Sequence, residues 1–207
     1  MLKIDKNGRI EWTSNIAYAT GLITTDGNLS TNGRHFTFVS KDIELIKTLK
    51  RCLELKNRIV PKKSGFSNKK YLKIQFGNVK LFRWLSSIGL KPNKKFVNKL
   101  KVPDKYFADF LRGHIDGDGC IRSFNDPWYP KSVRVYTVFN SANLRHVKWI
   151  RRSLSKLLGI RGWLESNNHI WKLTYAKNDS KKLLNFIYYS KNLPCLKRKR
   201  NKIMFLL

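Results

Sequence analysis

Acidic residues are scarce in this chain. Its 207 residues include 13 Asp and Glu against 43 Lys and Arg, a formal net charge of +30. Such an excess of one sign opposes compaction through self-repulsion unless a polyanion neutralises it. Nucleic acid is the first polyanion to consider, and an RNA-coating protein of the ribosomal kind fits the charge as well as a DNA-binding protein does. An anionic membrane fits less well, because no apolar run approaches the roughly 18 residues that span a bilayer.

Cysteine is scarce too. Cys52, Cys120 and Cys195 lie far apart, are odd in number and form no Cys-x-x-Cys pair. This pattern argues against a zinc ribbon or a disulfide framework. We therefore expect an intracellular, reducing compartment, whether the cytoplasm, the nucleoid or an organelle matrix.

The chain does contain an internal repeat. The segment AYATGLITTDGNLS (17–30) returns as DFLRGHIDGDGCIR (109–122), with Asp26 aligned with Asp118. Farther along, FVSKDIELIKTLKRCL lines up with FNSANLRHVKWIRRSL, and YLKIQF lines up with IWKLTY. Two copies of one supersecondary plan are therefore predicted.

Each copy is typical of a helix, strands, a helix, strands and a helix. The alternation in YLKIQF and IWKLTY predicts strands with one apolar face and one polar face that carries cations and amides. We expect helices at about 15–25, 42–55, 78–88, 104–117, 143–158 and 178–190. The predicted fold class is α/β, with two pseudo-symmetric αββαββα halves, an N-terminal one over 1–90 and a C-terminal one over 104–207. The stretch 91–103 contains two prolines and no clear period, which predicts a linker.

The first helix of each copy ends on Asp-Gly. The glycine fits the position after a helix end, where the left-handed conformation is common, but the carboxylate meets the partial negative charge of the helix C-terminus. One Asp-Gly is a common turn; two in matched contexts, in a chain with few acids, indicate that the charge is needed. Gly21 and Gly113 would let the two helices pack closely, by analogy with membrane helices. Asp26 and Asp118 would then meet, and a hard divalent cation, Mg²⁺ first, would offset their repulsion.

The repeated motif resembles a known family. ATGLITTDG (19–27) and LRGHIDGDG (111–119) are similar to the two motifs of single-chain LAGLIDADG homing endonucleases, and CLKRK (195–199) is similar to the closing element of that family. The resemblance covers nearly the whole chain. The first copy departs from the pattern at Thr24, where the second copy has the usual acid, Asp116.

The resemblance implies a site-specific DNA endonuclease whose two antiparallel sheets form DNA-binding saddles, with the motif helices packed at the interface between the halves. It would hydrolyse both strands of a long, loosely palindromic target and leave short 3′ overhangs. The last acid of each motif, Asp26 and Asp118, would bind the divalent ions, and the carbonyls of Thr25 and Gly117 would complete the metal shell. Mg²⁺ is the expected cofactor, Mn²⁺ a substitute, and Ca²⁺ an ion that supports binding without efficient cleavage.

Family members also place basic and polar residues beside the metals. The candidates here, with a register open by a residue or two, are Lys94, Lys95, Lys197, Arg198 and Lys199. Ser40 and Ser141 align with a polar position near the site and fit equally well as helix N-caps. Among the histidines, His114 is expected to pack within its helix and His35 to face DNA.

The polar strand faces would read the target, since an antiparallel ribbon fits the major groove. The candidate DNA-binding residues are Arg34, His35, Thr37, Lys73, Gln75, Arg122, Ser123, Arg134, Tyr136, Lys172 and Thr174. Strands of roughly 8–10 residues at ~3.3 Å each predict about nine base pairs for each half, hence roughly 18–22 in all. Because one chain supplies both motif helices, we expect a monomer on double-stranded DNA.

Two alternatives stay open. An intron maturase of the same fold would bind intron RNA as a splicing cofactor, and a regulator of the same fold would bind DNA without cutting it. The intact pair Asp26 and Asp118 favours the nuclease over both.

Overall fold

The first half of the chain folds around one four-stranded sheet. In this computed structural model, which describes residues 3–6, 8–62 and 71–204, its elements are α1 (Ser14–Thr25), β1 (Gly27–Leu29), β2 (His35–Ser40), α2 (Ile43–Leu53), β3 (Ile59–Lys62), β4 (Tyr71–Gly77) and α3 (Val79–Ser87). The sheet is antiparallel throughout, with the strand order β1-β2-β4-β3.

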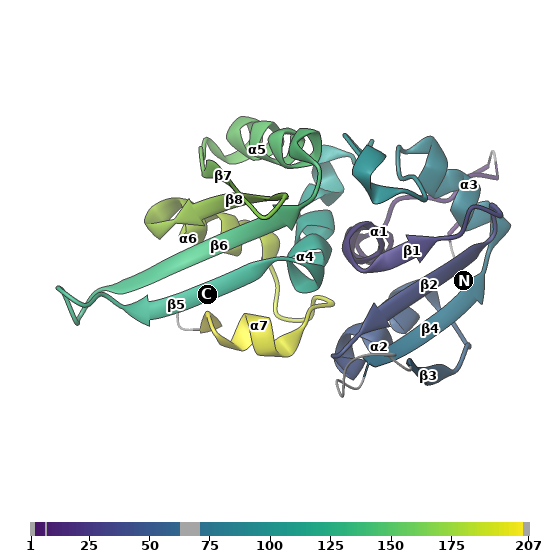
Figure 1. The fold of residues 1–207 in the computed structure, drawn as a ribbon, viewed down its shortest axis with the longest axis horizontal. Helices are drawn as coiled ribbons and strands as arrows, with labels where there is room; N and C mark the ends of the chain where they lie inside the picture. Colours follow the sequence, from purple (N-terminus) through teal and green to yellow (C-terminus); the bar gives the residue numbers. More distant parts are fainter. Residues whose placement is uncertain (1–2, 7, 63–70, 205–207) are drawn as a thin grey trace.

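The second half repeats this plan beside the first (Figure 1). Its elements are α4 (Phe107–Gly117), β5 (Cys120–Asn125), β6 (Val133–Ser141), α5 (Leu144–Leu158), β7 (Trp163–Asn167), β8 (Ile170–Ala176) and α6 (Lys177–Ile187), followed by a short helix, α7 (Lys197–Asn201). The strand order β5-β6-β8-β7 matches that of the first half. The structure thus confirms the two αββαββα halves.

Local signals explain the helix boundaries. The side chain of Thr13 accepts a hydrogen bond from the backbone N–H of Ile16 and caps α1, and Asn78 and Asn143 cap α3 and α5 in the same way. Gly159 ends α5 in the left-handed conformation, with φ of 68°. Every predicted helix is present within three residues at each end.

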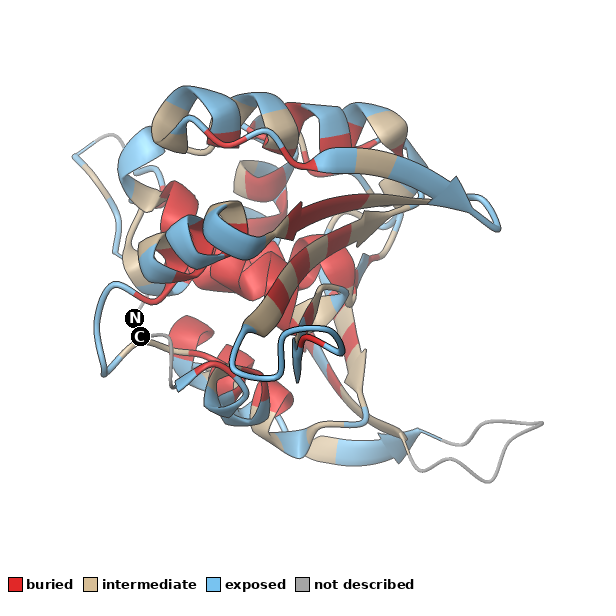
Figure 2. Cartoon of the chain, turned by 90° about the vertical axis from the view of Figure 1, so that its left-hand side faces the viewer, coloured by how far each residue is buried: buried red, intermediate tan, exposed pale blue. Residues whose placement is uncertain are grey.

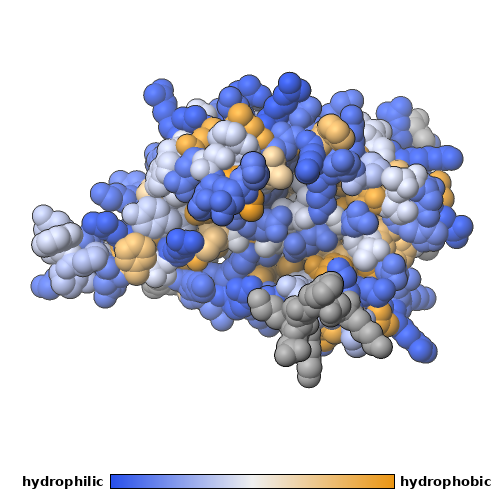
Figure 3. Space-filling view, viewed as in Figure 1, coloured by the Kyte–Doolittle hydropathy of each residue, from blue (hydrophilic) through white to orange (hydrophobic). Residues whose placement is uncertain are grey.

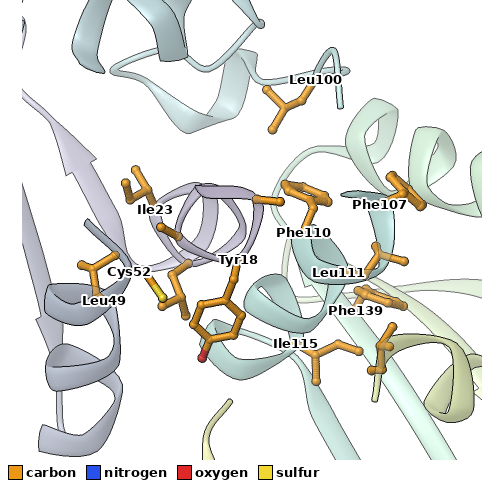
Figure 4. Packing of buried hydrophobic residues seen from close by; sticks show 14 of the residues in the cluster. Tyr18, Ile23, Leu49, Cys52, Leu100, Phe107, Phe110, Leu111, Ile115 and Phe139 are labelled. Atoms are coloured by element: carbon orange, nitrogen blue, oxygen red, sulfur yellow. The ribbon is translucent and has the colours of Figure 1, made fainter. Parts of the chain in front are cut away.

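The two motif helices pack at the centre of the molecule. A β-carbon added to Gly21 would lie 2.1 Å from the carbonyl oxygen of Phe110, and one added to Gly113 would lie 2.1 Å from that of Tyr18. The backbones of α1 and α4 therefore touch where the glycines face each other. Buried residues gather between the two halves (Figure 2), and side chains from both helices, including Tyr18, Phe110 and Ile115, pack at this junction (Figure 4).

The segment that joins the halves is part of the core rather than a free linker. Val97 and Leu100 are buried in it, and residues Lys94–Phe96 form a 3-10 turn. The side-chain amide of Asn143 donates hydrogen bonds to the carbonyls of Lys95 and Val97, at 2.7 and 3.2 Å, and so fixes the turn against α5. A second 3-10 turn, Asp104–Tyr106, leads into α4.

The surface is strongly hydrophilic on the face seen in Figure 3, as the charge requires. Among the described residues, no helix is long and apolar enough to cross a membrane.

Candidate active site

Two acids stand at adjoining helix ends. α1 ends at Thr25 and α4 at Gly117, so that Asp26 and Asp118 occupy the two C-cap positions. A β-carbon added to Gly117 would lie 1.9 Å from Oγ1 of Thr25 and 3.3 Å from Oδ2 of Asp26. The close packing that begins at Gly21 and Gly113 therefore continues to the helix ends and brings the carboxylate of Asp26 beside the end of α4.

The glycines that follow these acids do not have the predicted conformation. Gly27 and Gly119 are absent from the residues with positive φ. Each instead lacks room for a side chain, because a β-carbon would lie 2.7 Å from Cα of Ile23 in the first copy and 2.5 Å from Cα of Ile115 in the second. Glycine lets each chain turn back over the last turn of its helix and enter a strand.

The protein around the two acids disfavours their charge. Burial raises the pKa of Asp26 to about 7, and the negative charge of Asp118 adds to the effect. Although the side chain of Asp118 is exposed, the surrounding protein excludes much of its water, and this desolvation raises its pKa as well. Lys94 and Lys199 oppose both shifts. A divalent cation would bind the ionised pair and remove its repulsion, so the residues present fit such an ion.

Lys94 and Lys199 occupy equivalent places in the two halves. Nζ of Lys94 donates to the carbonyl of Thr25, the last residue of α1. Nζ of Lys199 contacts the carbonyls at the end of α4, at 2.9 Å for Asp116 and 3.2 Å for Gly117. Burial lowers the pKa of both ammonium groups, and the neighbouring carboxylates partly offset this. The carbonyls of Thr25 and Gly117 thus already face a cation, and each oxygen has a second lone pair.

The other basic candidates make different contacts. Arg198 makes a two-pronged ion pair with Asp42, 2.7 Å at its shorter contact, which joins α7 to the start of α2. Lys95 and Lys197 are exposed, and Lys95 lines a pocket that Asp118 also lines. Sequence alone left the register open, and the structure places the ammonium groups of Lys94 and Lys199 on the carbonyls at the ends of α1 and α4.

The two serines are not N-caps. Oγ of Ser40 accepts a hydrogen bond from the N–H of Asp42, and Oγ of Ser141 accepts one from that of Asn143, both at 3.1 Å. Asp42 and Asn143 are the N-cap residues themselves. Ser141 also lines a pocket beside Asp118.

Two buried residues that sequence reasoning did not assign to the site position its second half. Asp116 accepts hydrogen bonds from the hydroxyl of Tyr18 at 2.8 Å and the N–H of Leu196 at 2.7 Å. Arg112, fully buried, pairs with Asp109 at 2.5 Å and donates to the carbonyls of Ile187 and Pro194. Both residues fasten the C-terminal segment to α4, and that segment carries Lys199. The sequence signal that could have identified them is the presence of Asp and Arg in a helix that is otherwise largely apolar.

The first sheet presents the predicted polar face. Thr37 pairs with Gln75, whose amide donates to the threonine hydroxyl at 3.2 Å, and His35 and Lys73 lie on the same face by register. The opposite face carries the buried Phe36, Phe38, Ile74 and Phe76. Arg34 is exposed just before β2.

The second sheet corrects two of the predicted contacts, Ser123 and Thr174. Ser123 lies on the core side of β5, opposite the buried Val135, and donates to the carbonyl of Lys202 at 3.1 Å. Thr174 has the expected face but is only 5% exposed. Arg134 is held by an ion pair with Asp126 at 2.6 Å.

Arg122, Tyr136 and Lys172 share the outer face of this sheet. Aromatic rings also line it: Phe124 stacks on Tyr136 with ring centres 5.8 Å apart, and Trp163 meets Tyr136 edge-on. The outer faces of the two sheets therefore differ: the first is polar, and the second carries aromatic rings beside Arg122 and Lys172. Figure 1 shows the β5–β6 hairpin reaching farthest from the centre.

Comparison with known proteins identifies the fold. No protein-family model and no curated protein sequence matches the chain. Among solved structures, full-length DUF199/WhiA from Thermatoga maritima matches with a TM-score of 0.61 and 17% identity, over 94% of this chain and 62% of that one. The I-LtrWI LAGLIDADG homing endonuclease, solved bound to target DNA, matches with a TM-score of 0.61 and 16% identity, over 93% and 89% of the two chains. The homing endonuclease I-WcaI, bound to its DNA recognition sequence, matches equally well, over 93% and 88%.

These similarities show that the chain has the two-half LAGLIDADG fold. The chain spans about 62% of the length of the full-length DUF199/WhiA protein. Since all these identities lie below 25%, they establish the fold and not the activity.

The contribution of Asp26 to the stability of the metal-free protein is expected to fall as pH rises from about 4 to about 7. Folding raises the pKa of Asp26 from 3.8 to about 7, so across this window the folded chain holds a proton that the unfolded chain has released. The contribution is present in full below the unfolded pKa and is lost by about pH 7, a change on the order of 2–3 kcal/mol because the carboxyl is only half-buried. Urea unfolding of the wild type and of Asp26→Asn, in EDTA at pH 5 and pH 7.5, measures it. The free energy of unfolding of the wild type relative to Asp26→Asn should fall by this amount from pH 5 to pH 7.5; no change in the difference between the two proteins would contradict the assignment.

Proposed function

We propose that this protein is a metal-dependent, site-specific DNA endonuclease of the homing-endonuclease kind. The observation that carries the proposal is the pair of acids, Asp26 and Asp118, at the touching ends of two helices, each beside a lysine, in a chain with a net charge of +30. Charge and fold account for nucleic-acid binding. They do not account for two acids whose negative charges are disfavoured both by the helix C-termini and by their repulsion of each other.

In this proposal, Asp26 and Asp118, with the carbonyls of Thr25 and Gly117, hold the divalent ions. When bound, Mg²⁺ supplies an activated water and stabilises the leaving 3′ oxygen. Among the described residues, no three His, Cys, Asp or Glu side chains gather in one place, so phosphate oxygens of the DNA would complete the metal shell. Lys94 and Lys199 would place positive charge beside the phosphates as negative charge develops.

The outer faces of the two sheets would follow the major groove on either side of the cut. His35, Thr37, Lys73 and Gln75 would read or position one half-site, and Arg34 would contact the backbone beside it. Arg122, Tyr136 and Lys172 would serve the other half-site. Because the faces differ, each side would specify different bases.

The proposal predicts a long and uneven footprint. β6 has nine residues, whereas β2 and β4 have six and seven. At ~3.3 Å per residue the second half reaches about 30 Å and the first about 20–23 Å. At ~3.4 Å per base pair the protected region should therefore be roughly 15–16 base pairs, fewer than the roughly 18–22 expected from the sequence, with more of it on the side of the second half. Exchanging the two half-sites should weaken binding at least about tenfold, and affinity should fall steeply with salt. DNase footprinting on the site selected from a randomised library, and on the same site with its two halves exchanged, tests this; protection under about 12 base pairs, or indifference to the exchange, would show that the two-saddle arrangement is wrong.

Because the target is unknown, the function itself is tested on a library. The purified full chain is incubated with randomised duplex DNA and Mg²⁺, and the new ends are captured and sequenced. A recurrent site with short 3′ overhangs supports the proposal. Ca²⁺ in place of Mg²⁺ and the Asp26→Asn/Asp118→Asn double variant serve as controls that should bind without cutting. Enrichment of bound sites with no cut ends under any Mg²⁺ or Mn²⁺ condition would reduce the protein to a DNA-binding module and overturn the proposal.

A further inference from the structure

A pocket of about 190 Å³ lies beside Asp118. Lys94 contributes to it from the connecting segment, Asn140 and Ser141 from the end of β6, and two histidines from the helices behind. The pocket has room for several water molecules, and its walls supply the polar partners that water needs.

The histidines form a buried pair. His114 of α4 and His146 of α5 approach to 3.2 Å between their Nε2 atoms, and both side chains are almost wholly buried. Burial lowers the pKa of His146 to about 4 and that of His114 well below its usual value, so both rings are neutral near pH 7. One Nε2 must then donate and the other accept. Nδ1 of His114 has no hydrogen-bond partner among the described residues, nor has Oδ1 of Asn140.

Leaving such buried atoms without a partner costs about 1–3 kcal/mol each. His114 and Asn140 both line the pocket, so a water in it that reached these atoms would satisfy them and would be held next to Asp118. The side-chain amide of Asn140 also donates to the backbone carbonyl of Asp118 at 2.6 Å, so the same wall fixes the acid. Asn140 therefore both lines the pocket and holds the backbone of Asp118.

The first half of the chain provides an internal comparison. Leu22 follows Gly21 as His114 follows Gly113, and Leu45 stands three residues after the N-cap of α2 as His146 stands three after that of α5. Both leucines are buried in the core.

Val39 takes the place of Asn140, one residue before the repeated serine, and its side chain cannot donate a hydrogen bond. The two halves thus share a backbone arrangement, but three polar side chains beside Asp118 correspond to three apolar side chains in the first half.

We propose that the two halves of the catalytic site are unequal, and that His114, His146 and Asn140 are positioning residues that hold water beside Asp118. This rests on the nuclease function proposed above. Hydrolysis forms a bond from the water oxygen to phosphorus and breaks the bond from phosphorus to O3′. The products are a 5′ phosphate and a 3′ hydroxyl, whose proton comes from the water. The half that stores water reacts first, so one particular strand is cut before the other.

A duplex target with a different label on each strand tests the order of cutting. The wild-type protein should pass through a nicked duplex in which the same strand is always cut. His114→Leu/His146→Leu copies the leucine pair of the first half, and Asn140→Val copies Val39. Each variant should slow the first-cut strand at least tenfold, leave the other within twofold and keep target affinity within twofold.

The control is Thr137→Val/Ser180→Ala, which removes a buried hydrogen bond of 2.7 Å from the same half but away from the pocket. It should not alter the ratio of the two strand rates. Equal rates for both strands in the wild type, or equal slowing of both in the pocket variants, would overturn the proposal while leaving the nuclease function intact. A wild-type protein that cuts neither strand would instead refute the nuclease function. Should the double histidine variant fold poorly by thermal unfolding, Asn140→Val alone decides the outcome.

Discussion

Replacing Asp26 or Asp118 by asparagine is expected to lower the rate of double-strand cleavage by about a thousandfold, with target affinity largely kept. Asparagine has the same shape but no charge, so the helix ends stay packed while the cation loses its ligand. Removing a single group that stabilises transition-state charge commonly has an effect of this size. Single-turnover cleavage with saturating protein, beside a binding titration in Ca²⁺, separates the two effects.

The matched control is Asp104→Asn. Asp104 is an exposed acid that pairs with Lys156 at 3.2 Å, with both side chains more than half exposed. Its loss removes the same charge from the chain and should leave the cleavage rate within twofold. Wild-type cleavage by either Asp26→Asn or Asp118→Asn would refute the metal assignment.

The features that sequence predicts here are those fixed by local periodicity and by repetition. Helix spans follow from apolar spacing and caps, and the match between the copies predicts that Asp26 and Asp118 are equivalent. The αββαββα plan follows from the same two sources. These predictions agree with the folded structure because each depends on a short stretch of chain.

What sequence misses depends on neighbours that are remote in the chain. Only the folded segment from 88 to 103 shows that Lys94, and not Lys95, reaches the end of α1. Thr174 has the predicted face, but its surroundings bury it. The sequence alone could have excluded Ser123 from the candidate DNA-binding residues. Consecutive residues of a strand point to opposite faces, and the neighbouring Arg122 was already assigned to the outer face. The His114–His146 pair has no sequence signal, because it joins two helices through their buried sides.

Substituting alanine for Gly21 or Gly113 is expected to destabilise the protein by about 3 kcal/mol or more, and valine at either position should abolish the fold. Helix propensity alone predicts the opposite change in stability, because alanine in a helix interior is normally more favourable than glycine by about 1 kcal/mol. Here a β-carbon would lie 2.1 Å from a backbone carbonyl oxygen of the facing helix. A backbone atom cannot rotate away as a side chain can, so α1 and α4 must separate and their packing is lost.

Chemical unfolding in EDTA at pH 5, where repulsion between the acids is weakest, isolates this packing effect. Ser155→Ala is the control: Ser155 is exposed on α5, and its replacement changes helix preference without touching another element. It should leave stability unchanged or raise it slightly. Separation of the helices would also move Asp26 from Asp118, so Gly113→Ala should lose affinity for the divalent ion together with stability. Wild-type stability in Gly21→Ala and Gly113→Ala would mean that the two helix backbones are not in contact, and the shared site between their ends would lose its structural basis.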